Sequence, residues 1–156
     1  MSAMKIILGF STMWLGAMVG IYLAVLVHDR RIRDLTAEQY VAMHQMRDKT
    51  FAKVMPPVGL ATLFLIAIGT GLALSPGWPR MSGCVAVMCL VADIVITVCR
   101  QVPLNRRVQG WTAAAAPAEW SLARDVWTAQ HHLRCLLALL AYVLYGTASF
   151  SSVAQW

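Results

Sequence analysis

One stretch of the chain places an imidazole, two guanidinium groups and two indole rings on a single helical stripe. Its members recur at spacings of four, three, four and three residues: Trp120, Arg124, Trp127, His131 and Arg134. At 100° per residue, these side chains stay within about 80° of one another. A belt of tryptophans and snorkelling arginines at a membrane surface is one explanation. The other is a polar groove inside a helix bundle, where an imidazole can act as a base.

A second stripe with helical spacing lies earlier in the chain and comprises Tyr40, His44, Arg47 and Phe51. Thr36 is a good helix cap and Glu38 lies in the first turn, so a helix is expected from about Ala37 to Val54. An amphipathic helix in the membrane interface would explain this pattern by packing alone. His44, which lies between an aromatic side chain and a base, is instead a candidate for chemistry.

All four histidines are expected at the same end of the molecule: His28, His44, His131 and His132. Clustered imidazoles are compatible with a bound copper or iron ion or with a haem. His131 and His132 point about 100° apart on a helix, so they cannot chelate one ion by themselves. A site built from His28, His44 and His131 stays open, although no E-x-x-H, H-x-H or 2-His-carboxylate spacing supports it.

The composition places these residues in a membrane protein. Hydrophobic residues make up 59% of the 156 and charged residues 13%, against roughly 45–50% and 25% in soluble domains. The expected fold class is all-α. Residues 1–156 are expected to form one domain, an integral membrane four-helix bundle with an additional cytoplasmic amphipathic helix between the first and second spans.

Four apolar segments are long enough to cross about 30 Å of hydrocarbon, which takes roughly 17–25 helical residues. They cover about 6–27, 55–74, 81–99 and 133–150. The first is interpreted as a retained helix, because no small-residue cleavage site follows it. The second is expected to begin at Pro56-Pro57, since proline suits the first turn of a helix.

Basic residues are distributed unequally between the two sides of this bundle. The long connections and the helix ends beside them contain eleven, whereas the other side contains only Lys5 and Arg80. This bias predicts a multi-pass plasma (inner) membrane protein with both long connections in the cytoplasm and both termini outside. The expected partners are the lipid bilayer and a small-molecule substrate, with no nucleic acid, because the basic residues lie where membrane topology requires them. Gly16-x-x-x-Gly20 is compatible with a homo-oligomer.

Asp93 lies inside the third predicted span. An ionised carboxylate there costs roughly 2.5–3.5 kcal/mol on insertion scales, so it is expected to face the bundle interior and to be paired. Its depth brings it level with the beginning of the fourth span, where His131 and Arg134 are possible partners. A site component and a structural ion pair are both open interpretations.

Three stretches together resemble the small four-helix membrane proteins that include the anthrone oxygenases of polyketide biosynthesis. They are Gly16–Gly20, the block His44–Phe51 followed by Val54-Met55-Pro56, and Val102–Arg107 followed by Trp120, Trp127, His131 and Arg134. The most specific part is P-L-N-R followed by W…W…H-x-x-R. The resemblance spans most of the chain in the family's usual order and implies the same four-helix fold.

The resemblance implies that an electron-rich small molecule such as an anthrone is oxidised by O₂. In that reaction a CH₂ between two aromatic rings becomes a carbonyl, which requires a base and groups that hold the resulting enolate. His131 or His44 would be the base, Arg134 and Asn105 would bind the oxyanion, and Asp93 would orient His131. No cofactor would be needed, with O₂ as co-substrate.

The remaining polar and aromatic residues of the two stripes would then bind the substrate. Trp120 and Trp127 are expected to stack on a flat ring system, with Tyr40 and Arg124 beside them. Two alternatives stay open: a metal- or haem-dependent membrane oxidase that uses the histidines as ligands, and a non-enzymatic accessory protein in which both stripes serve only packing.

Overall fold

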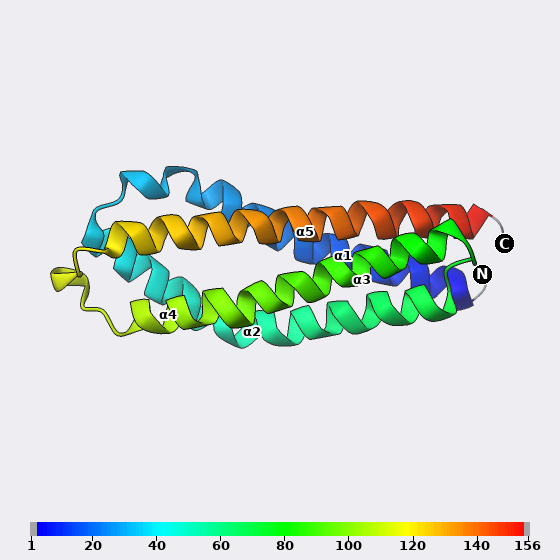
Figure 1. The fold of residues 1–156 in the computed structure, drawn as a ribbon, viewed down its shortest axis with the longest axis horizontal. Helices are drawn as coiled ribbons and strands as arrows, with labels where there is room; N and C mark the ends of the chain where they lie inside the picture. Colours follow the sequence, from blue (N-terminus) through cyan, green and yellow to red (C-terminus); the bar gives the residue numbers. More distant parts are fainter. Residues whose placement is uncertain (1–2, 155–156) are drawn as a thin grey trace.

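The computed structural model describes residues 3–154 and consists of four long helical rods joined by short connections (Figure 1). The elements are α1 (Ala3–His28), the 3₁₀ segment η1 (Asp29–Asp34), α2 (Ala37–Leu72), α3 (Trp78–Ile96), the π-helical segment η2 (Thr97–Gln101), α4 (Val102–Gln109), the 3₁₀ turn η3 (Ala113–Ala115) and α5 (Trp120–Ala154). The all-α prediction is therefore confirmed. All four rods are long and apolar enough to cross a membrane.

The helix predicted from Ala37 to Val54 is present, but it is not a separate element. It forms the first half of α2, which continues through Pro56 and Pro57 to Leu72. The structure therefore does not show the additional amphipathic helix as an element separate from the second span. The two prolines cannot donate to the carbonyls one turn earlier. Those carbonyls belong to Ala52 and Lys53, which are exposed residues. The helix changes direction along its length (Figure 1).

The beginning of α2 has a complete capping box. The Thr36 side chain accepts from the backbone N–H of Gln39, and the Gln39 side chain accepts from the backbone N–H of Thr36. At the other end of the bundle, Gly77 precedes α3 with φ +87°, a conformation that favours glycine, and Pro79 lies in the first turn of α3. These local signals fix where the helical hairpins reverse.

The third rod contains a π-helical turn between α3 and α4. The N–H of Val102 donates to the carbonyl of Thr97, five residues earlier, and Pro103 follows with no N–H to donate. The wider turn changes the direction of the side chains that follow. It leaves Gln101 buried, at 3% exposed, in the interior of the bundle.

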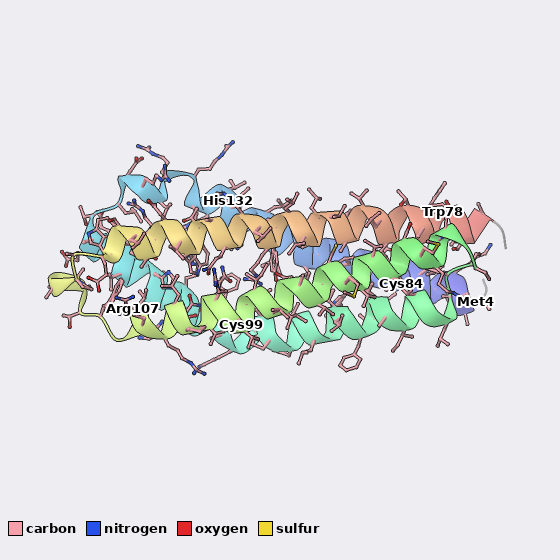
Figure 2. The ribbon with its side chains drawn as sticks, in the orientation of Figure 1. Met4, Trp78, Cys84, Cys99, Arg107 and His132 are labelled. Atoms are coloured by element: carbon pink, nitrogen blue, oxygen red, sulfur yellow. The ribbon has the colours of Figure 1, made fainter. Side chains whose placement is uncertain are left out.

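The core is formed mainly where α5 packs along α3 and α1. In the half nearer the termini, the buried Tyr145 hydroxyl lies 2.8 Å from the hydroxyl of Ser11. A Cβ at Gly69 would collide with that tyrosine, so the glycine lets α5 approach α2. Both termini lie at this end (Figure 1), whereas the nitrogen-bearing side chains concentrate toward the opposite end, around α4 and the start of α5 (Figure 2).

Candidate active site

A cavity of about 520 Å³ lies among the helices in the polar half of the bundle, within the usual range for small-molecule sites. Most of its wall is apolar, including Ile21, Val25, Phe51, Met55, Ile94 and Val98. Its polar lining includes Tyr22, His44, Arg47, Asp93, Gln101, Asn105, Trp127, His131 and Arg134. Every residue proposed from sequence as base, oxyanion-binding group or orienting carboxylate therefore lines one cavity.

Asp93 and Arg134 form the buried ion pair at the centre of this lining. Nε of Arg134 donates to Oδ1 of Asp93 at 2.7 Å. The hydroxyl of Tyr22 donates to Oδ2 of Asp93 at 2.8 Å and accepts from Nη2 of Arg134. Nη1 of Arg134 donates to Oε1 of Gln101. The expectation that Asp93 faces the interior and pairs with a group at the beginning of the fourth span is thus confirmed for Arg134.

His131 is held by a backbone carbonyl instead of by Asp93, so the expectation that Asp93 orients it is wrong. Its Nε2 lies 3.1 Å from the carbonyl oxygen of Tyr22. A carbonyl can only accept, so Nε2 carries the proton. In the neutral imidazole the lone pair is therefore on Nδ1, to which no residue within 3–154 donates. Nδ1 is also not among the buried side-chain nitrogens and oxygens of this range that lack a partner. It therefore keeps some accessible surface, on a residue that lines the cavity, and can accept a proton.

His44 is buried, and both of its ring nitrogens are engaged. Nε2 lies 3.2 Å from Oδ1 of Asn105, and Nδ1 lies 3.3 Å from the hydroxyl of Tyr40. Nδ2 of Asn105 donates to the carboxylate of Asp48 at 2.6 Å, which identifies Oδ1 as the acceptor and Nε2 of His44 as the donor. The lone pair on Nδ1 consequently accepts from Tyr40, and His44 has no free basic nitrogen facing the cavity.

Asn105 connects three elements through its side-chain amide. Its Oδ1 also accepts from Nε1 of Trp127 at 3.1 Å, while Asp48 holds its amide nitrogen. Asp48 accepts a second hydrogen bond from Gln109 at 2.9 Å. The interactions of Asn105 therefore fix α4 against α2 and α5. One N–H of Nδ2 has no partner among residues 3–154, so the oxyanion-binding role expected from sequence stays a prediction.

The ring of Trp127 is packed between other side chains of the site. It stacks on the imidazole of His131 with centroids 5.1 Å apart and planes inclined by 17°, and it meets His44 edge-on. The guanidinium carbon of Arg47 lies 4.0 Å from its centroid, a cation–π geometry. Trp127 is only 7% exposed, so its ring has no free face on which a substrate could stack. Its contacts instead hold His131 and Arg47 in position.

The other three predicted substrate-binding residues lie outside the lining of the cavity. The Tyr40 and Trp120 rings pack together with centroids 5.9 Å apart, in a second core cluster with Ile32 and Val41. Arg124 lies over the Trp120 ring and donates to Asp125 at 3.0 Å. The structure therefore does not bring Trp120, Tyr40 and Arg124 to the place where a substrate would sit. They pack at the end of the bundle that lies away from the two termini.

The four histidines do not come together as metal ligands. His28 is exposed and pairs with Asp29 at 3.1 Å, and His132 is exposed on α5, where Figure 2 labels it. His44 and His131 are separated by the Trp127 ring that both contact. Within residues 3–154, no group of three or more His, Cys, Asp or Glu side chains could hold a metal ion. The predicted site from His28, His44, His131 and His132 is therefore not formed.

The site predicted from sequence lacked three of the polar residues that line the cavity in the structure. Tyr22 lies in an uncharged span with no polar stripe, and Gln101 is brought inward by the π-helical turn. Arg47 was part of the second stripe but was assigned no role. Its Nη1 pairs with Oδ2 of Asp29 at 2.5 Å, which places its guanidinium at the cavity. The helical spacing of the second stripe could have identified Arg47. No local sequence pattern identifies Tyr22 or Gln101.

Comparison with known proteins adds one match. A family model described as anthrone oxygenase matches residues 43–144, which include every polar lining residue named above except Tyr22. No curated protein sequence matches the chain, and no solved structure matches it. The family match covers well over half of the 156 residues, so this chain belongs to the anthrone oxygenase family.

Proposed function

We propose that this chain is a membrane-embedded oxygenase that uses O₂ to oxidise a flat, electron-rich aromatic carbon acid of the anthrone type in the cavity. The observation that supports this most directly is the free lone pair of His131 Nδ1, in a largely apolar cavity next to a buried cation. The family match supports the reaction class.

The reaction needs one base and one co-substrate. His131 Nδ1 takes a proton from the substrate CH₂, and the electron pair of that C–H bond delocalises into the ring system and its carbonyl oxygen. The carbanion gives electrons to O₂ and forms a C–O bond, which yields a hydroperoxide after protonation. Loss of the second C–H proton with cleavage of the O–O bond leaves the carbonyl and releases water, so that CH₂ and O₂ become C=O and H₂O.

His131 is well placed for a transient positive charge. The Tyr22 carbonyl accepts from Nε2 and stabilises the imidazolium, as the partner of a catalytic histidine does in other enzymes. The stacked Trp127 ring fixes the imidazole plane. The Asp93–Arg134 pair next to it is already neutralised, so Arg134 adds a local dipole instead of a free charge.

The substrate would enter from the bilayer. Leu60 of α2 and Val98 of η2 both line the cavity, and they are 50% and 59% exposed. Side chains at these positions would face lipid in a membrane-spanning bundle, and we propose a lateral entrance between α2 and η2. A flat, sparingly soluble aromatic molecule partitions into lipid and reaches the site without crossing water.

Turnover of a dihydroxyanthrone by the detergent-purified protein tests this function, measured as quinone absorbance and O₂ uptake above the uncatalysed rate. His131→Ala is expected to lower kcat at least 100-fold, the usual contribution of a general base. The matched control is His132→Ala, which makes the same change one residue away at an exposed position. Turnover of His131→Ala within twofold of the control contradicts the proposal.

A further inference from the structure

Gly59 of α2 leaves a gap in the wall of the cavity. It belongs to the helical stripe Met55, Gly59, Thr62 and Ile66. Thr62 and Ile66 are fully buried, so this face of α2 points into the bundle. Apart from its neighbouring backbone, a Cβ built on Gly59 would meet no heavy atom of residues 3–154 within 4 Å. Gly59 lines the cavity, whereas Thr62 and Ile66 do not, so the gap is part of the cavity and lies near its end along α2.

The stability of the protein alone does not account for this gap. Glycine inside a helix is less stable than alanine, and an interior space without side chains loses packing contacts. Close contact between helices explains two other interior glycines, because a Cβ would collide with Tyr145 at Gly69 and with Thr70 at Gly83. Gly59 has no such neighbour, so the space beside it is available to a ligand.

The wall of α2 that leads to the gap is apolar. Between Phe51 and Leu60, the cavity-lining residues of this helix carry no charged or hydrogen-bonding side chain. α2 runs from the polar end of the bundle toward the termini (Figure 1), so Gly59 lies farther along it than His44 and Arg47. A ligand hydroxyl or carboxylate against this wall would lose water and find no side-chain partner on α2. An alkyl group would lose nothing and would gain from burial.

The cavity is also larger than the ring system of the proposed substrate. An anthrone packed as closely as a protein interior would fill only about half of the 520 Å³. Building on the proposed function, we infer that the gap at Gly59 binds an alkyl substituent of the aromatic substrate. Gly59 thereby determines which substituents the cavity accepts, while His131 on α5 acts on the ring CH₂.

Non-reacting probes measure this subsite separately from turnover in the detergent-purified protein. The probes are a dihydroxyanthraquinone and the same molecule with a propyl group at the outer edge of one ring. Gly59→Leu fills the gap and is expected to weaken binding of the propyl probe at least tenfold, since each buried CH₂ contributes about fourfold in affinity. Binding of the unsubstituted probe should stay within roughly twofold. Gly59→Ala adds one methyl group in open space and should weaken the propyl probe about threefold.

The matched control is Gly71→Leu, the same change on the same helix at an exposed position that has open space and does not line the cavity. Equal affinity of Gly59→Leu and Gly71→Leu for the propyl probe would overturn the alkyl subsite. Equal loss of both probes in Gly59→Leu would also overturn it, since the leucine would then obstruct the place of the rings. Normal turnover of His131→Ala together with selective loss of the propyl probe in Gly59→Leu would overturn the proposed function and support the subsite.

Discussion

Nε of Arg134 on α5 lies 2.7 Å from Oδ1 of Asp93 on α3, and both side chains are about nine-tenths buried. The two charges stabilise each other where neither can be hydrated. A lone Asp93 or a lone Arg134 at this depth would be costly, so the pair explains how a charged cluster persists inside an apolar bundle.

Asp93→Asn is therefore expected to be strongly destabilising. It leaves the Arg134 guanidinium buried without a counter-charge, which costs about 3–5 kcal/mol when one partner of a buried pair is removed. The double variant Asp93→Asn/Arg134→Gln removes both charges and should recover a large part of this loss. The unfolding free energies of the two single variants and the double variant, measured by denaturation in mixed micelles, give the interaction energy of the pair. If the losses of the two single variants simply add up in the double variant, the two side chains do not interact.

His44→Gln should affect stability more than chemistry. Both nitrogens of His44 are engaged by Asn105 and Tyr40, and its side chain is buried. Loss of these hydrogen bonds is expected to cost about 1–3 kcal/mol, with turnover per folded molecule within threefold of the unaltered protein. Quinone formation normalised to folded protein checks this; a 100-fold loss at unchanged stability would assign the base role to His44.

Two glycines on the same helix should respond in opposite ways to alanine. A Cβ at Gly69 meets the buried Tyr145 hydroxyl, so Gly69→Ala is expected to destabilise the fold by about 1–3 kcal/mol. Gly71 has open space around it, and Gly71→Ala should stabilise α2 by roughly 0.5–1 kcal/mol through helix propensity. Thermal unfolding in detergent compares the two; equal effects would mean that α5 does not approach α2 at Gly69.

Topology can be measured with single cysteines in a cysteine-free background. Ala114→Cys lies in η3 and Pro76→Cys lies in the turn before α3, and both positions are exposed. The basic bias of the long connections predicts that an impermeant maleimide labels position 76 on intact cells and position 114 only in inverted vesicles. The reverse labelling pattern would invert the predicted orientation.

Local signals determined the helices. The Thr36 cap and the acidic first turn predicted helical residues 37–54, and the four-three spacing placed Trp120 to Arg134 on one helical stripe, which α5 confirms. These features follow from hydropathy, capping and helical periodicity, which depend on residues within a few turns of each other. The same reasoning wrongly separated α2 at Pro56-Pro57, because a proline pair is equally compatible with a helix start and with an interruption inside a longer helix.

Asp93 was predictable for a related reason. An ionisable group inside a span must be paired, and helix rise alone places it level with Arg134 on another span. Neither hydropathy nor spacing identifies Tyr22 or Gln101 as further partners of that pair.

The tertiary structure alone decided which groups are free to act. His131 and the carbonyl of Tyr22 that fixes its tautomer are separated by 109 residues, and His44 loses its basic lone pair to Tyr40 through an amide oriented by Asp48. The sequence determined that two imidazoles, two arginines and a carboxylate would meet at one end of a bundle. Which nitrogen retains a lone pair, and which donors are left unpaired, depends on hydrogen-bond directions between distant segments, and local patterns carry no information about those directions.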